Sequence, residues 1–547
     1  MDTMAVTASK SRNIDAHRPF NRQAPYTGAF SVLMATLFIV PLSARPALAQ
    51  DWKFTPFVSA AATASDNSNQ SATDPQSALI LSVTPGFNLA SEGSRRIKAS
   101  LGYSLTGIVR VGGNDQSDDI NHNLNATGKA ELIDDFLFID GNANVSQQLI
   151  SLLGSPSDAS TNSANRATVG TYSLSPYIQK RLGTFAVAQA RLTHAGAIFQ
   201  NDVAATSMSD TLTASLKSGT RFNDVSWSLD YSLRKADNSA TSTTQSNTTT
   251  FETVSGTLGY ALTRKFRVFG TAGRDSNDFV NASASNGDYY SAGFGWSPTQ
   301  RTSLEASAGK RFNGNSYALS MLHRTHNSNW NVRYSEDVSD QSQRNYTESS
   351  RAFISCLDGS FQELFNLNAP TPTGCTRLTS RQVLSELLGV ANSLGVTLTQ
   401  DQVLATGLIN SSLAQGVFII KNLTSGVSWA KGKLGTGLSV FDTRRNFILV
   451  GNLEDHTRGI SGNVNYRLNP HTSVSSTLSL SNNQIPAGLG TAIDRDDNLY
   501  SASVSLTHSF DPKLSGVLTL RHQQRDSNDP ASSYDENSIT ASVTKRF

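Results

Sequence analysis

The side chains that could do acid–base or metal chemistry in this chain of 547 residues are nine histidines, two cysteines and a few groups of aspartates. Three histidines share the parity of the apolar residues that alternate around them: His122, His508 and His522. Four others lie in or beside predicted turns: His323, His326, His456 and His471. None stands in an HExxH, CxxC or triad-like pattern. We therefore expect no catalytic residues and no cofactor, and the protein is predicted not to be an enzyme.

Two groups of aspartates could offer carboxylate oxygens to calcium, which prefers oxygen ligands. They are Asp115, Asp118 and Asp119, and Asp494, Asp496 and Asp497. Neither group has the residue spacing of an EF-hand loop, and solvated loops are often rich in Asp and Asn. We expect no metal site.

The N-terminus has the pattern of an export signal. Basic residues precede an apolar stretch at 29–42, and the sequence SARPALAQ follows it. The apolar stretch is too short to span a bilayer, and the small residues Ala47 and Ala49 suit a signal peptidase. Residues 1–49 are therefore predicted to be a signal peptide, with the mature chain starting at Gln50.

Export gives the two cysteines a role. Cys356 and Cys375 would meet an oxidising compartment, where a disulfide is expected. Closing a loop of about 20 residues would stabilise the fold by roughly 3 kcal/mol on the chain-entropy model.

The charge balance excludes a nucleic-acid partner. Lys+Arg number 45 and Asp+Glu 43, and five of the cations fall within the predicted signal peptide. The mature chain is thus close to neutral, with no basic stripe of the kind that binds phosphate backbones.

Alternation of apolar and polar residues dominates the mature chain. At 97–111 the odd positions are mostly apolar, whereas the even ones include Lys98, Ser100, Ser104, Thr106 and Arg110. The same split recurs at 79–89, 225–233, 290–296, 500–510 and 539–547. A period of two indicates strands with one apolar and one polar face.

The connections alternate as well. Short turns alternate with long polar loops along the chain. The short turns lie near residues 92–94, 133–135, 181–184 and 511–513, and the long loops at 64–77, 235–250, 275–288 and 482–498. This arrangement is typical of outer-membrane barrels. The fold is predicted to be an all-β, antiparallel, up-and-down transmembrane barrel over residues 50–547, with about 22 strands in a range of roughly 18 to 24.

The strands of a soluble β-sandwich would also alternate between apolar and polar residues. Its core is formed by apolar faces, however, and does not account for the strongly polar faces of these strands. A closed barrel gives one face to outer-membrane lipid and the other to a watery lumen. The predicted lumen-lining residues are Lys98, Arg110, Asn121, Asn123, Asn125, Asn463, Asn465 and Arg467. Aromatic residues near strand ends, such as Tyr260, Trp296, Trp330 and Tyr466, suit interfacial girdles.

Residues 339–415 interrupt the alternation. The two cysteines are followed by two helix-like segments, each with a capping-box spacing at Thr379 with Gln382 and Thr399 with Gln402. By the parity of the turns, this insertion is predicted to lie in an extracellular loop. It is either a surface cap or a plug that folds into the barrel mouth.

The C-terminus ends in SITASVTKRF, which alternates to a terminal aromatic residue. A barrel must pair its last strand with its first, because a free edge in lipid leaves backbone groups unsatisfied. Phe547 is predicted to act also as an assembly signal for the barrel-assembly machinery.

Several stretches resemble one family. WKFTPFVSAAATASDN at 52–67, VTPGFNLASEGSRRIKASLGYSLTGIVR at 83–110 and INHNLNATGKAELIDDFLFIDGNANVSQQ at 120–148 are similar to outer-membrane proteins associated with PEP-CTERM/exosortase exopolysaccharide loci, as is KNLTSGVSWAKGKLGTGLSVFDTRR at 421–445. The resemblance implies an outer-membrane barrel of a Gram-negative cell, with exopolysaccharide and its export proteins as partners. Lys545 departs from the family, which usually has an aromatic residue two positions before the terminal one.

These observations leave three functional hypotheses. The first is a passive pore or scaffold for exopolysaccharide export and surface sorting, with a weakly charged lumen of Ser, Thr and Asn that offers donors and acceptors to sugar hydroxyls. The second is a general or nutrient-specific porin. The third is a structural surface or adhesion protein.

The insertion generates a prediction. A bore of about 22 strands is wide enough to need occlusion. Removing residues 345–412 should raise the single-channel current in a planar bilayer if the insertion is a plug, whereas an unchanged current would identify a surface cap.

Overall fold

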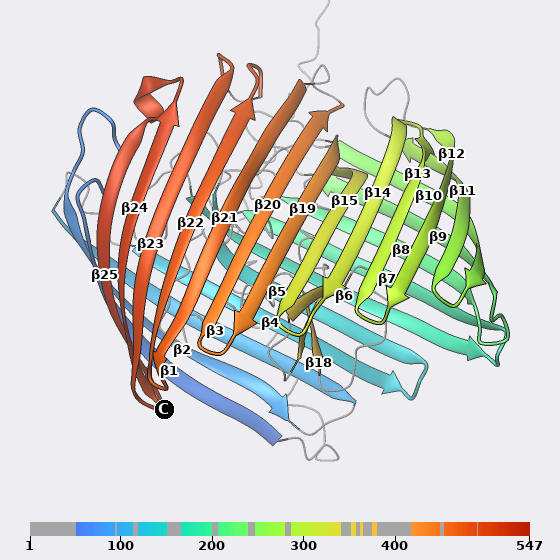
Figure 1. The fold of residues 1–547 in the computed structure, drawn as a ribbon, viewed down its shortest axis with the longest axis horizontal. Helices are drawn as coiled ribbons and strands as arrows, with labels where there is room; N and C mark the ends of the chain where they lie inside the picture. The colour runs from blue at the N-terminus through green and yellow to red at the C-terminus, as the bar shows by residue number, and fades with distance from the viewer. Residues whose placement is uncertain are drawn as a thin grey trace, which may run out of the picture. The chain divides into compact units, whose positions relative to one another are not determined.

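The structure is a computed structural model that describes residues 51–92, 96–112, 119–149, 166–199, 206–238, 247–278, 286–340, 352–356, 361–364, 375–379, 417–448, 453–489 and 491–547. Nearly all of these residues belong to strands (Figure 1). Within these ranges no helix has the length and hydropathy needed to cross a bilayer. The predicted signal peptide and the two helix-like segments after Cys375 lie outside the described residues.

Twenty-two strands form one antiparallel sheet. They are β1 Asp51–Ser65, β2 Ala78–Glu92, β3 Ile97–Val111, β4 Asp119–Ile133, β5 Leu137–Leu149, β6 Arg166–Leu182, β7 Ala186–Phe199, β8 Ser207–Ser218, β9 Val225–Asn238, β10 Asn247–Thr263, β11 Phe266–Asp278, β12 Gly287–Thr299, β13 Thr302–Arg311, β14 Gly314–Arg324, β15 Ser328–Asp340, β19 Val417–Lys431, β20 Leu434–Phe447, β21 Leu453–Asn469, β22 Thr472–Ile485, β23 Arg495–Asp511, β24 Leu514–Ser527 and β25 Tyr534–Arg546. A short 3-10 turn, η2 Pro530–Ser532, joins the last two.

Each strand pairs with the next along the chain, β15 pairs with β19, and β25 returns to β1. Figure 1 shows this closure, where red β25 lies beside blue β1. The predicted up-and-down barrel and its strand number are confirmed. Closure leaves the barrel without a sheet edge, so each of its strands has a backbone partner on both sides.

The two faces of the wall differ as the alternation predicts. On β3, Val109 and Val111 are about half exposed on one face, while Ile108 and Arg110 are buried on the other. On β23 the buried odd positions are Ser501, Ser503, Ser505 and Thr507. Register partners share a face, so this parity continues from strand to strand around the barrel. The apolar face points outward to lipid and the polar face inward.

The two ends of the barrel also differ. One end, which we call the short-turn end, has tight connections such as 264–265, 300–301, 432–433 and 512–513. The first residue of β1 and the last residue of β25 also lie at this end. The other end, the long-connection end, holds the wider loops, with the tight 312–313 connection as an exception. Several predicted loops are shorter than expected. Strands extend to Asp278, Ile485 and Asn238, because polar residues continue the ladder beyond the apolar belt.

Outward aromatic residues gather near the short-turn end. Tyr260, Trp296, Trp330, Tyr466 and Phe510 are each between 44% and 61% exposed and lie within a few residues of their turns. A second set of outward tyrosines lies further along the strands, and includes Tyr103, Tyr172, Tyr231, Tyr317 and Tyr500. Two girdles of this kind mark the two interfaces of a membrane.

Between β15 and β19 the structure describes a separate three-stranded sheet, with β16 Ala352–Cys356 in the middle, flanked by β17 Phe361–Leu364 and β18 Cys375–Thr379. The register of β16 and β18 places Cys356 directly opposite Cys375. Opposite residues of antiparallel strands are at a separation that a disulfide can bridge. The register thus supports the predicted disulfide, and the bond stays a prediction.

The closing seam joins β1 and β25 over nine register pairs, from Phe57 with Arg546 to Ser65 with Ser538. Inward hydroxyl pairs cross it, with Thr63 Oγ1 2.9 Å from Thr540 Oγ1 and Thr544 Oγ1 donating to Ser59 Oγ at 3.0 Å. At its short-turn end, the backbone N–H of Phe547 donates to Pro56 O at 3.0 Å. The last residue therefore completes the ladder.

Deleting Phe547 removes one seam hydrogen bond and an aromatic side chain that is 62% exposed. We expect less heat-modifiable, membrane-inserted protein and more periplasmic degradation, with unchanged signal-peptide cleavage, as shown by gel mobility of fractionated cells. The matched control is Phe510→Ala, another outward phenylalanine at the same end and 61% exposed. If both variants assemble at the level of the unmodified protein, Phe547 is not an assembly signal.

Candidate functional site

The inner wall of the barrel is the surface on which a hydrophilic solute could be bound or passed. All eight predicted lumen residues have inward parity. Lys98 and Arg110 lie on β3, where Thr106 is the register partner of Asn121 on β4. Asn123 and Asn125 continue that face of β4. On β21, Asn463, Asn465 and Arg467 alternate with the outward Val464, Tyr466 and Leu468, which are 44–46% exposed.

Hydroxyl groups cover the inner wall from β22 to β25. The register places Ser475 opposite Ser505, Thr477 opposite Ser503 and Ser479 opposite Ser501. On the next strand, the hydroxyls of Ser505 and Thr519 are 2.9 Å apart. Ser538, Thr540, Ser542 and Thr544 continue the surface on β25. A hydroxyl both donates and accepts, so the partly exposed members of this surface, such as Ser475 and Thr477 on β22 and Thr540 and Ser542 on β25, can exchange hydrogen bonds with water or with sugars. The hydroxyls of Ser501, Ser503 and Ser505 on β23 are buried.

Aromatic rings lie flat on the inner wall where they face a glycine on the neighbouring strand. Phe57 is the register partner of Gly86, and a Cβ at that glycine would lie 2.5 Å from the phenylalanine ring. Phe269 is similarly opposite Gly293, at 2.5 Å. Tyr289 with Gly273 and Phe441 with Gly459 repeat the arrangement. Only glycine leaves room for the ring, which covers the exposed backbone.

The inner wall also carries charges, which corrects the expectation of a weakly charged lumen. At the long-connection end Asp497, 1% exposed, accepts from two arginines. Arg495 Nη2 lies 2.9 Å from its Oδ2, and Arg525 Nη2 bonds the same oxygen. Ser527 Oγ donates to Oδ1. The carboxylate is thus the centre of a buried network between β23 and β24.

A second buried network reaches the closing seam. Glu536, 2% exposed on β25, accepts from Ser65 Oγ of β1 at 2.8 Å and from Gln70 Nε2 at 2.8 Å. Arg521 of β24 pairs with it at 3.3 Å and also donates to Gln523 Oε1 at 2.8 Å. Gln70 belongs to the β1–β2 connection, so this network holds that connection against the inner wall.

Further ion pairs continue around the same end. Arg110 pairs with Asp119 at 3.0 Å, Arg311 with Asp275 at 3.0 Å, and Arg445 with Asp455. Asp119 and Asp497, considered above as calcium ligands, are therefore bound to arginines, while Asp115 and Asp118 lie outside the described residues. Among the described side chains no group of His, Cys, Asp or Glu has an arrangement that could hold a metal ion.

The histidines have structural partners on the outward face. His122 bonds Tyr103 at 2.9 Å, His508 bonds Thr472 at 2.9 Å, and His522 bonds Asn537 at 2.9 Å. His194 lies between Tyr172 at 3.1 Å and Asp210 at 2.8 Å. Each contact joins neighbouring strands, so it supports strand pairing at the membrane interface.

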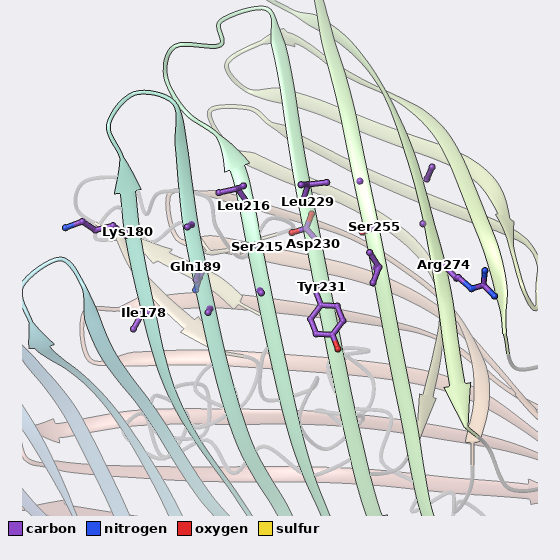
Figure 2. Close-up of a pocket in the computed structure, with 17 residues that line it drawn as sticks. Ile178, Lys180, Gln189, Ser215, Leu216, Leu229, Asp230, Tyr231, Ser255 and Arg274 are labelled. Atoms are coloured by element: carbon purple, nitrogen blue, oxygen red, sulfur yellow. The ribbon is translucent and has the colours of Figure 1, made fainter.

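A hollow of about 670 Å³ lies over β6–β11 (Figure 2). Small residues at outward positions form its floor: Ala188, Ala190, Ala214, Gly256 and Ala272. Outward Leu216, Leu229 and Tyr231 border it. The hollow is an indentation of the lipid-facing surface, so it does not belong to the bore.

The residues predicted from the sequence did not include the paired charges Arg521, Arg525 and Glu536, or the inward Lys129 and Arg191. The alternation of the sequence could have identified them, because each one stands at a position of the polar face of its strand. Asp497 was assigned to a loop, since the strand start at Arg495 falls within a run of polar residues.

The network around Asp497 yields a stability prediction. Asp497→Ala removes the buried acceptor that Arg495 and Arg525 share, which should lower the free energy of unfolding by about 3–5 kcal/mol. Arg495 keeps its pair with Asp529 at 3.3 Å. Asp496→Ala is the control, because the neighbouring residue is exposed with outward parity and should change stability by less than about 1 kcal/mol. Urea unfolding in lipid vesicles, followed by tryptophan fluorescence, measures both. Equal stability of the two variants would show that the network contributes nothing specific.

The chain is similar in part to a known family and in its fold to solved structures. Residues 456–547 match the family described as "Putative beta-barrel porin 2". Among solved structures, the siderophore receptor PirA from Acinetobacter baumannii is similar with a TM-score of 0.50 and 10% identity, over 90% of this chain and 80% of that chain. The FrpB iron transporter from Neisseria meningitidis (F5-1 variant) has a TM-score of 0.48 and 9% identity, over 91% and 83%. No curated protein matches the sequence.

At 10% identity, the likeness to PirA concerns the fold alone. The family match runs from His456 on β21 to the last strand. It includes the hydroxyl-covered wall of β22–β25, the Asp497 network, and Glu536 with Arg521, but not Ser65 and Gln70. Together with the closed sheet and its outward apolar face, these findings make the chain a β-barrel of the outer-membrane type, with a C-terminal part similar to a porin family.

Proposed function

We propose that this barrel is a passive outer-membrane pore for hydrophilic carbohydrate, working with an exopolysaccharide export and surface-sorting system. The observation that carries the proposal is the hydroxyl-covered inner wall of β22–β25. Its partly exposed hydroxyls, such as Ser475, Thr477, Thr540 and Ser542, lie between Arg546 at the short-turn end and Arg521 and Glu536 towards the other end. They offer donors and acceptors, so a sugar polymer can exchange water for side-chain hydrogen bonds there.

A further feature, a set of aromatic rings on the inner wall, supports a carbohydrate. The rings of Phe57, Phe269, Tyr289 and Phe441 lie against the wall over their glycines, and all are partly exposed. A flat apolar face of this kind suits the C–H face of a sugar ring. The role in exopolysaccharide export rests on the sequence resemblance described above.

A nutrient-specific or general porin is the second candidate. The observation that favours it is the match of residues 456–547 to a porin family. Both candidates require an open path through the barrel, and they differ in the size of the solute and the direction of transport. A scaffold that only holds partners requires no path.

Two measurements separate these functions. A pore should conduct in planar bilayers, and vesicles that contain it should swell in isotonic solutions of small sugars. Deleting the gene should reduce surface polysaccharide if the solute is the exported polymer, and complementation should restore it. Unchanged surface polymer together with slower sugar uptake would identify a nutrient porin, whereas a barrel that conducts nothing would be a scaffold.

A further inference from the structure

We propose that the inner wall holds a binding patch for an acidic saccharide, formed by Lys98, Lys129, Phe138, Asp140, Tyr177 and Arg191. We call it the lysine patch. The inference deepens the proposed function, on which it rests for the identity of the ligand as a carbohydrate, and it adds that this carbohydrate carries negative charge.

The register brings these residues together from five neighbouring strands. Lys98 of β3 is directly opposite Lys129 of β4, and Lys129 is opposite Asp140 of β5. Tyr177 of β6 is opposite both Phe138 of β5 and Arg191 of β7. Lys98 has the inward parity of Arg110, so the whole patch faces the bore.

The side chains form one compact group. The rings of Phe138 and Tyr177 are stacked, with centroids 4.9 Å apart and an interplanar angle of 15°. Lys129 Nζ lies 5.9 Å from the Phe138 ring and 6.0 Å from the Tyr177 ring, within cation–π range. Arg191 Cζ is 3.9 Å from the Tyr177 ring, so Arg191 covers the buried tyrosine.

The charges of the patch do not balance. Asp140 Oδ2 pairs with Arg191 Nη1 at 3.0 Å, which leaves the two lysines as the excess. Glu131, two residues along β4 on the same face and opposite Phe138, offsets one of these two charges. It also accepts from the backbone N–H of Asp135 at 2.6 Å in the adjacent turn. The patch therefore has net positive charge, in contrast to the long-connection end, where the arginines named above have acidic partners.

The pairing of Lys98 with Lys129 is unfavourable by itself. Like charges directly opposite on neighbouring strands destabilise a sheet, and both side chains are exposed to the bore. A carboxylate bound within reach of both ammonium groups would replace this repulsion by attraction. An anion would therefore gain energy at this pair of lysines.

The surroundings favour a saccharide over a simple anion. Phe138 is partly exposed beside the lysines and offers an apolar surface. At the next inward pair towards the long-connection end, the hydroxyl oxygens of Ser100 and Thr127 lie 2.8 Å apart. Charge, an aromatic ring and hydroxyls in one place match the carboxylate, the C–H face and the hydroxyls of a uronic acid residue.

The test is equilibrium binding to the full mature barrel, refolded in detergent, with hexagalacturonate and maltohexaose as acidic and neutral probes of equal length. We expect hexagalacturonate to bind more tightly and its affinity to fall with added salt. Lys98→Gln and Lys129→Gln should each weaken it by about fivefold, because each removes one close charge. Maltohexaose binding should not change.

Lys180→Gln is the matched control. Lys180 lies on β6 at the same end of the barrel but has outward parity, with its Nζ 5.9 Å from the Phe136 ring. It should bind hexagalacturonate as the unmodified barrel does.

Equal binding of the two probes, or hexagalacturonate binding that the Lys98→Gln, Lys129→Gln double variant retains, would overturn the lysine patch. Conductance decides the proposed function separately. A barrel that binds hexagalacturonate through the lysines but passes no current would keep the patch and refute the pore.

Discussion

The requirement that every backbone N–H and C=O within a membrane finds a partner in the chain determines this structure. A sheet can meet it only by closing, so the nine-pair seam between β1 and β25 is the contact on which the other twenty strands depend. The seam is shorter than the ladders beside it, and side chains reinforce it. Hydroxyl pairs cross its middle, the Glu536 network lies at one end and the Phe547 backbone bond at the other.

Closure also fixes what each residue can do. Once the sheet is a barrel, alternate residues face lipid or bore, and a change of parity would move a side chain from one solvent to the other. The charges follow this division. At the long-connection end the inward Arg495, Arg521 and Arg445 are paired with acids in buried networks. Near the short-turn end Lys98 and Lys129 are register partners on the bore face, and the cations there outnumber the acids Asp140 and Glu131. The first arrangement is suited to structure and the second to a ligand.

The alternation in the sequence was sufficient to predict the fold. Each residue of a barrel strand faces either lipid or the bore, so its polarity indicates its face without knowledge of its neighbours on other strands. The alternation gave the strand number, the faces of residues such as Asn463 and Arg467, and the insertion between β15 and β19. It could not give the ends of the strands, since the polar residues around Asp275 and Asp497 continue the ladder outside the lipid and resemble loops. Nor could it give the partners of Arg495, Glu536 or Lys129, because these depend on the register between strands, which composition does not encode.

The most direct test of the account is the accessibility of consecutive residues on β21. Single cysteines at positions 463–468, in a chain with Cys356 and Cys375 replaced by serine, can carry a nitroxide whose collisions with oxygen and with a water-soluble nickel complex are measured in lipid vesicles. The account predicts that labels at Asn463, Asn465 and Arg467 meet the nickel complex, whereas labels at Val464, Tyr466 and Leu468 meet oxygen dissolved in lipid. A uniform profile, or the opposite alternation, would contradict a polar bore enclosed by this wall.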